Sequence, residues 1–253
     1  MNQLHVSRPR EGVVLIEIDA PPSNALNFET RKVFEAELDA IEQDFDVRCV
    51  IVTGRGAGFC AGDDLREVGK RDGEAPTGLG QFGRLLDKIE RLRAPVIAAV
   101  NGYAIGGGLE LALCCDIRIA SEKAFFLGAG VNVGLMASVY RLPRLIGVGP
   151  AKAMLLTGTR TSAETALRYG LVTAIYSADA LMSEALTLAE RIATRAPLSV
   201  EASKRMIGQT FDLTPDEAGA ASGRELSVLT RSSDHKEGVR AFLAKGEPKF
   251  TRS

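Results

Sequence analysis

The sequence is poor in the residues from which metal and disulfide sites are built. Its 253 residues include two histidines, His5 and His235 near opposite ends of the chain, and four cysteines without CxxC spacing. This distribution argues against a zinc site and a disulfide framework, so we expect no metal and a reducing, cytoplasmic compartment. The sequence also lacks a run of roughly 20 apolar residues that could cross a bilayer, and its first residues lack the apolar core of a signal peptide.

An excess of either charge is absent as well. The chain has 31 Lys and Arg against 32 Asp and Glu, so we expect no general surface for nucleic acid or for an anionic membrane. No GxxxxGK[ST] motif occurs, and the glycines of Gly54–Gly58 do not complete GxGxxG, which argues against a nucleotide cofactor. The remaining composition is ordinary for a globular protein, with 45% hydrophobic residues and enough length to bury a core in one large or two small domains.

The stretch Val96–Cys115, VIAAVNGYAIGGGLELALCC, combines a strand, a turn and a helix start. Glycines from Gly106 onward let the backbone approach a ligand closely, and the first amides of a helix point outward without an internal partner. Glu110 lies one turn after Gly107 on the same helical face. Amide donors for a developing negative charge with a carboxylate nearby indicate an acid–base site.

A second stretch repeats this arrangement earlier in the chain. The strand Cys49–Thr53 is followed by a glycine-rich turn that leads through Gly62 into Asp63–Glu67, which we expect to open a helix with acidic residues near its N-terminus. Two units that each expose amides after glycine could converge on one ligand atom.

The remaining elements alternate between strand and helix at first and become mainly helical after Arg144. We expect Lys70–Gly83, which has little periodicity, to be an exposed loop. Thr161–Glu164 and Thr214–Glu217 have the pattern of capping boxes. The other predicted elements are strands at Val13–Ile18, Asp116–Ala120 and Ala124–Leu127, and helices whose apolar faces carry Phe34, Leu38 and Ile41, then Leu85, Ile89 and Leu92, then Leu181, Ala185, Leu188 and Ile192.

Four motifs together resemble the crotonase superfamily, the enoyl-CoA hydratases and isomerases. They are PPSNALN (Pro21–Asn27), VIVTGRGAGFCAGDDLREV (Val50–Val68), AVNGYAIGGGLELALCCDIRIAS (Ala99–Ser121) and SDHKEGVRAFLAKGEPKF (Ser233–Phe250), in the family's order over nearly the full chain. The resemblance implies an α/β fold, with a spiral of ββα units over residues 1–195 and a C-terminal helical region over 196–253 for trimerisation and pocket closure. It also implies a homotrimer or dimer of trimers that acts on an acyl-CoA substrate without any cofactor beyond the coenzyme A of the thioester.

The same resemblance assigns roles to individual residues. The amides of Asp63 and Gly107 would hold the thioester oxygen as it becomes enolate-like, and Glu110 would be the first of two catalytic glutamates. Asp63 stands where the family usually has a small residue, although its amide remains available. The remaining positions match the substrate and CoA site. They are Ala61 and Leu65 toward the adenine end, Gly106 beside the amides that would hold the thioester oxygen, and Lys249 and Phe250 in the C-terminal segment.

The second glutamate of the family pattern is missing. Gly130 occupies its position, and the interval Phe125–Arg141 contains no acidic residue. One alternative is an altered hydratase in which Asn132 or Tyr140 shares the work of Glu110, although either could equally be an ordinary wall residue. Another is a different enolate reaction, namely isomerisation, decarboxylation or carbon–carbon bond chemistry, with space over Gly130 for a substrate carboxylate or an anion, as in the naphthoyl-CoA synthase branch. A third is an acyl-CoA-binding protein with little catalysis.

Overall fold

A six-stranded sheet lies at the centre of the computed structural model, which describes residues 3–64, 67 and 77–253. Its strand order is β1 (Leu4–Arg10), β2 (Val13–Ile18), β4 (Cys49–Gly54), β7 (Val96–Val100), β9 (Ile117–Ser121) and β12 (Ala174–Tyr176). The strands run parallel to their neighbours except β1, which pairs antiparallel with β2.

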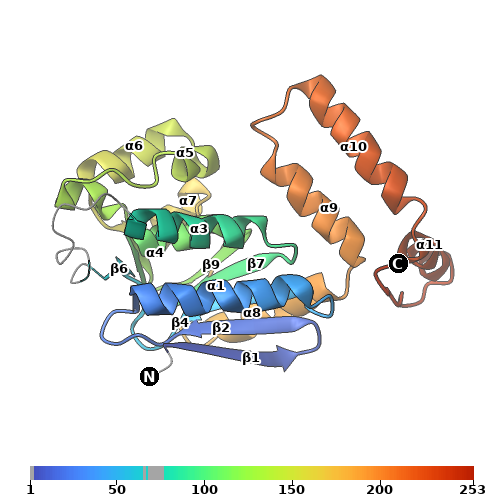
Figure 1. Ribbon diagram of the computed structural model, residues 1–253, viewed down its shortest axis with the longest axis horizontal. Coiled ribbons are helices and arrows are strands. Elements are labelled where there is room, and N and C mark those ends of the chain that lie inside the picture. Colours follow the sequence, from blue (N-terminus) through green and yellow to red (C-terminus); the bar gives the residue numbers. More distant parts are fainter. Residues whose placement is uncertain (1–2, 65–66, 68–76) are drawn as a thin grey trace.

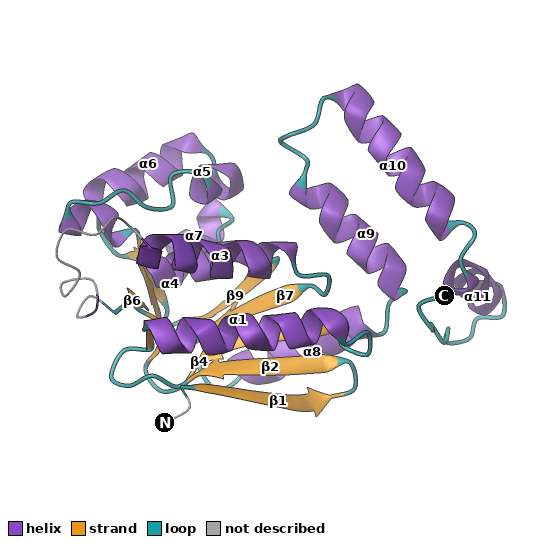
Figure 2. Cartoon of the chain, viewed as in Figure 1, coloured by secondary structure: helices purple, strands orange, loops and turns teal. Residues whose placement is uncertain are grey.

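Alternate residues of the central strands pack into two separate apolar layers. Val50 and Val52 of β4 lie in the layer beneath α1 (Phe28–Gln43) and α3 (Thr77–Arg91), whereas Cys49 and Ile51 lie in the layer against α8 (Leu181–Ala193). Figures 1 and 2 show α1 and α3 on one side of the strands and α8 on the other. Burial on both faces explains the continuous apolar runs of these strands, and it confirms the apolar helix faces predicted from the sequence.

Short strands form a second layer beside the first sheet. A four-stranded sheet has the order β11 (Thr161–Ser162), β10 (Phe125–Leu127), β8 (Tyr103–Ile105) and β5 (Gly58–Cys60), and β3 (Ala25–Leu26) pairs with β6 (Gly62–Asp63). A long strand, a short strand and a helix therefore follow one another repeatedly, as in β7, β8 and α4 (Gly107–Cys114). This repetition confirms the spiral of ββα units.

Three local predictions need correction. The segment Lys70–Gly83 is not a loop throughout, because α3 begins at Thr77 and residues 70–76 lie outside the described ranges. Asp63 belongs to β6 and not to a helix start, since its backbone pairs with that of Leu26. Ser162, and not Thr161, caps α7 (Ala163–Tyr169), because α7 begins at Ala163 and the Ser162 side chain accepts a hydrogen bond from the Thr165 amide.

The chain from Arg141 onward is mainly helical, and part of it stands away from the sheets. The helices are α5 (Arg141–Ile146), α6 (Val148–Thr157), α7, α8, α9 (Pro197–Gly208), α10 (Pro215–Leu229) and α11 (Ser233–Leu243), with a short 3₁₀ helix, η1 (Ala129–Val133), before them. The capping box at Thr214 and Glu217 is confirmed. Figure 1 shows α9 and α10 extending away from the body of the protein. Across the described ranges, no helix combines the length and apolarity needed to cross a membrane.

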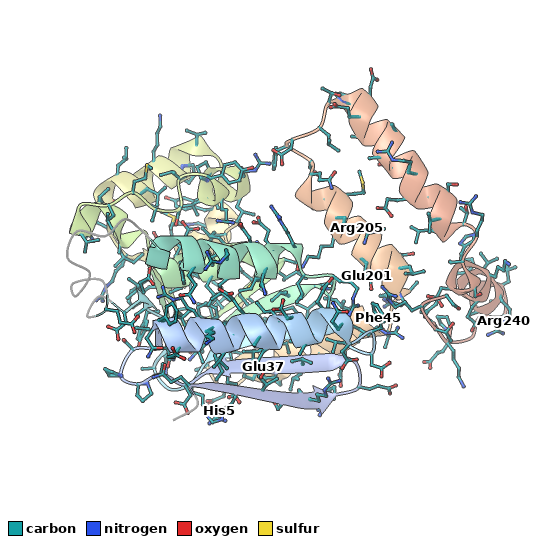
Figure 3. All side chains as sticks on the ribbon, in the orientation of Figure 1. His5, Glu37, Phe45, Glu201, Arg205 and Arg240 are labelled. Carbon is teal, nitrogen blue, oxygen red and sulfur yellow. The ribbon has the colours of Figure 1, made fainter. Side chains whose placement is uncertain are left out.

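A buried cluster of charges fastens these helices to the body. Glu201 of α9 is 5% exposed, and it accepts hydrogen bonds from Arg93 at 2.9 Å and from Arg252 at 3.0 Å. Both guanidinium groups also lie over the ring of Phe45, 5.2 Å and 4.0 Å from its centroid. Figure 3 shows Glu201 and Phe45 where α9 meets the end of α1. Elements more than 100 residues apart are thus joined through one carboxylate.

We expect Glu201→Gln to lower the free energy of unfolding by about 3 kcal/mol, because it leaves the buried Arg93 and the partly buried Arg252 without their counter-charge. The matched control is Glu225→Gln, which breaks an exposed ion pair with Arg205 at 2.9 Å and should change the value by less than about 1 kcal/mol. Urea denaturation measures both. Equal effects of the two substitutions would show that the buried cluster does not fasten α9.

Candidate active site

The two glycine-rich turns meet at β6 and the start of α4. A Cβ atom on Gly62 would lie 2.6 Å from the backbone nitrogen of Gly107, and Gly62 has a φ of +90°. Both features require glycine, since a side chain would push the two segments apart and few other residues adopt this φ. The amide of Asp63, which follows Gly62, is therefore brought beside that of Gly107. The structure thus brings together the two predicted donors.

Packing beneath this contact explains the three consecutive glycines. Gly106 precedes α4 with a φ of +53°, and its carbonyl accepts from the Glu110 amide at 3.1 Å. A Cβ on Gly107 would lie 2.8 Å from the ring of Phe82, and one on Gly108 would overlap the carbonyl oxygen of Cys60. The first amides of α4 are consequently held in a fixed position against β5 and β6.

Glu110 lies one turn into α4 and is largely enclosed. Its side chain is 14% exposed, and its Oε1 accepts a hydrogen bond from the backbone amide of Ser138. Its Oε2 is 3.8 Å from Nη1 of Arg141 and has no hydrogen-bond partner among the described residues. One oxygen is therefore fixed, while the other is buried without a hydrogen bond among the described residues.

Ser138 and Arg141 were not predicted to belong to the site. Ser138 is 4% exposed and has a φ of +59°, which is uncommon for a residue other than glycine. Arg141 is held from the other side by Glu90 at 2.8 Å and Asp87 at 3.1 Å, both on α3. No sequence signal identified Ser138, because its partner is determined by the path of the segment that precedes α5.

Gly130 does not open onto free space. A Cβ atom there would lie 2.8 Å from the carbonyl oxygen of Leu135 and 3.0 Å from the amide nitrogen of Ala137. The expectation that a substrate carboxylate or an anion occupies the space over Gly130 stays a prediction, but main chain lies close to the point where a side chain at position 130 would begin. The same segment continues to Ser138, which contacts Glu110.

The other predicted substrate residues differ in where they lie. Ala61 immediately precedes β6, with its amide bound to the carbonyl of Ser23 at 3.2 Å, whereas Leu65 lies outside the described residues. Asn132 donates to the carbonyl of Gly158 at 2.9 Å, after α6, and not to Glu110. Tyr140 is exposed and lies beneath the guanidinium of Arg144 at 4.7 Å.

Lys249 and Phe250 lie apart from the rest of the predicted site. The Lys249 amide donates to Glu237 of α11 at 2.9 Å, and the Phe250 carbonyl accepts from Arg48 at 3.3 Å. In Figure 1 the C-terminal segment lies at the opposite end of the chain from β6. Within one chain, these two residues are not brought to Glu110.

The side chain of Asp63 points to a further residue that sequence reasoning missed. It forms an ion pair with Arg31 of α1, whose side chain is 1% exposed. A signal was present, because Arg31 continues the stripe of Phe34, Leu38 and Ile41 at spacings of three and four residues. A charge on the buried stripe of a helix requires a partner.

Cys60 lies beneath the same turn but does not supply a nucleophile. It is fully buried, and burial raises the pKa of its thiol to about 12. A thiol with this pKa remains protonated at neutral pH. Within the described ranges, no group of three metal-binding side chains occurs either. The arrangement is therefore suited to stabilising an oxyanion with two amides while one carboxylate moves protons at a neighbouring carbon.

Comparison with known proteins agrees with this geometry. Residues 8–253 match the sequence family described as enoyl-CoA hydratase/isomerase. The chain is 37% identical to a short-chain-enoyl-CoA hydratase from Clostridium acetobutylicum over 93% of each chain. It is 35% identical to 2,3-dehydroadipyl-CoA hydratase from Escherichia coli over 99% of each. A crystal structure of enoyl-CoA hydratase from Bacillus anthracis superposes with a TM-score of 0.96 at 32% identity, covering 99% of this chain and 100% of the other.

We expect Gly130→Ala to lower the free energy of unfolding by about 1–3 kcal/mol, because the methyl group would press against the main chain of Leu135 and Ala137. The control is Gly149→Ala on the exposed side of α6, where a Cβ meets no atom within 4 Å. Thermal unfolding should show the control to be unchanged or slightly stabilised. A stable Gly130→Ala variant would contradict the filled space described above.

Proposed function

The chain belongs to the enoyl-CoA hydratase/isomerase family, and on that premise we propose that it hydrates an enoyl-CoA thioester with Glu110 as its single acid–base residue. The observation that carries this proposal is the Glu110 carboxylate one turn after Gly107, with one oxygen fixed by the Ser138 amide. The other oxygen has no hydrogen bond among the described residues and lies 3.8 Å from Nη1 of Arg141. The hydratases to which the chain is similar, at 35–37% identity, support the direction of the chemistry.

One carboxylate is sufficient for the addition of water. As the water oxygen bonds to Cβ of the substrate, its proton passes to Glu110, and the electron pair of the double bond moves to the thioester oxygen. The amides of Asp63 and Gly107 stabilise that oxyanion, and each such donor typically contributes about 3 kcal/mol. Glu110 then returns the proton to Cα, so that the elements of water are added and the carboxylate is regenerated.

Isomerisation of the double bond is the second candidate. It requires the transfer of a proton from Cα of a 3-enoyl thioester to Cγ, which a single carboxylate performs without water. The closed main chain over Gly130 favours it, because no acid stands in that part of the wall. The same filled space argues against reactions that would place a substrate carboxylate at Gly130.

We also propose that the enzyme works as a trimer or dimer of trimers whose contacts involve the C-terminal helices. None of the residues of α10 is buried within one chain, and Phe242 of α11 is 83% exposed. Between α9 and α11 lies an apolar groove of about 320 Å³ that Phe250 helps to line. Because Lys249 and Phe250 lie far from Glu110 in their own chain, their expected contact with CoA would be made in a neighbouring subunit.

Glu110→Gln tests the assigned chemistry. With crotonyl-CoA and a 3-enoyl-CoA as substrates, we expect kcat to fall by about a hundredfold or more with little change in KM, because the amide cannot accept the proton. Absorbance of the conjugated thioester follows both reactions, and Glu122→Gln, at an exposed turn residue, is the matched control.

Loss of absorbance from crotonyl-CoA identifies hydration, and its appearance from the 3-enoyl substrate identifies isomerisation. If Glu110→Gln turned over each active substrate as fast as the wild type, Glu110 would not be the acid–base group. Binding of both thioesters without turnover by the wild type would identify an acyl-CoA-binding protein instead.

Light scattering tests the assembly. We expect a mass several times the 27.0 kDa of one chain, reduced by Leu226→Glu combined with Phe242→Glu, because charges on a buried contact are unfavourable. Leu167→Gln on α7, where the side chain is 42% exposed, is the control. A wild-type protein with the mass of one chain would overturn the proposal.

A further inference from the structure

We infer that Arg31 is a positioning residue that holds both donors of the oxyanion hole and neutralises the carboxylate that Asp63 brings next to it. The inference rests on the proposed use of the Asp63 and Gly107 amides, but not on the identity of the reaction. It concerns a residue of α1, a helix that contributes no donor to the hole itself.

The first link joins Arg31 to Asp63. Nη1 of Arg31 forms an ion pair with Oδ1 of Asp63, and Nη2 lies 3.8 Å from a carboxylate oxygen of Glu67. The backbone of Asp63 is held by the same region, since β6 pairs with β3 and Leu26 lies opposite Asp63. Asn27 then caps α1, and the Arg31 amide donates to its carbonyl at 3.0 Å. Asp63 is therefore fixed by its main chain and by its side chain.

The second link joins Arg31 to Gly107. The guanidinium carbon of Arg31 lies 5.9 Å from the centroid of the Phe82 ring, within the range of a cation–π contact. The same ring contacts the start of α4, because a Cβ on Gly107 would lie 2.8 Å from two of its atoms. Phe82 is 6% exposed and cannot move aside without opening the core. One buried arginine thus contacts the supports of both amides.

The charges of Asp63 and Arg31 affect how well the site stabilises the enolate. Asp63 carries a negative side chain on the residue whose amide must stabilise a negative enolate oxygen, so its carboxylate disfavours the enolate. The ion pair with Arg31 offsets that charge in a setting where screening by water is weak, since Arg31 is 1% exposed. Removal of Arg31 alone takes away the positive charge paired with Asp63, whereas removal of Arg31 and Asp63 together takes away both members of that ion pair.

A double-mutant cycle with Arg31→Met, Asp63→Ala and their combination tests the inference. We expect Arg31→Met to lower kcat about 10- to 100-fold with a much smaller change in KM, because the loss falls on the enolate and not on CoA binding. The combined variant should recover a large part of that loss. A purely structural arginine would produce losses that add, and additive losses would overturn the inference.

A second measurement is independent of turnover. Acetoacetyl-CoA ionises to an ultraviolet-absorbing enolate without any step that requires Glu110, so the bound enolate fraction reports the hole directly. We expect this fraction to fall in Arg31→Met and to rise again in the combined variant. Arg93→Met, which removes another buried arginine, should lower stability and leave the fraction unchanged. An unchanged fraction in Arg31→Met would overturn the inference.

The two proposals fail separately. If no enoyl-CoA is turned over but the enolate fraction follows the cycle, the proposed reaction is wrong and the role of Arg31 stands. Should Arg31→Met not fold, Arg31→Lys keeps the charge and loses the planar fork. The Arg31→Lys variant should lower the bound enolate fraction by less than tenfold. When Asp63 is replaced by Ala, the proteins with Arg and with Lys at position 31 should have nearly the same enolate fraction. A difference in enolate fraction that persists in the Asp63→Ala background would contradict the ion-pair role.

Discussion

The backbone contact between Gly62 and Gly107 is the constraint on which the site depends. These residues approach so closely that a Cβ on Gly62 would lie 2.6 Å from the nitrogen of Gly107. Parallel pairing of β3 with β6 holds one side of the contact, and the packing of α4 against β5 holds the other. Two segments more than 40 residues apart are thereby brought into contact, and in the proposed site their amides bind one ligand atom, which no single helix N-terminus achieves.

Several carboxylates lie around the contact between Gly62 and Gly107, and each makes different contacts. Glu110 receives a backbone amide on one oxygen, and its other oxygen has no hydrogen bond among the described residues, which suits the proposed proton transfer. Asp63 is paired with a buried arginine. Glu90 and Asp87 orient Arg141, which approaches Glu110 to 3.8 Å. Unpaired carboxylates in such a setting would oppose the enolate that the two amides stabilise.

The segment between Gly130 and Ser138 shows how one position can alter a site. With glycine at position 130, the carbonyl of Leu135 and the amide of Ala137 close over the space that a side chain would take. The same segment continues to Ser138, whose amide donates to Glu110. Glycine at position 130 and the fixation of Glu110 therefore belong to one short stretch of main chain.

The sequence by itself determined the order of elements and the ββα spiral, because periodicity, glycine requirements and motif order are local properties. It also predicted two amide donors and Glu110 as the acid–base group, and it contains no acidic residue between Phe125 and Arg141. It also contained an unused signal, the charge of Arg31 on the buried stripe of Phe34, Leu38 and Ile41. The tertiary structure decided which groups meet. Arg31 and Asp63 are 32 positions apart, and Glu110 and Ser138 are 28 apart. Their partners follow from strand pairing and from the path of a short segment, which no local pattern encodes.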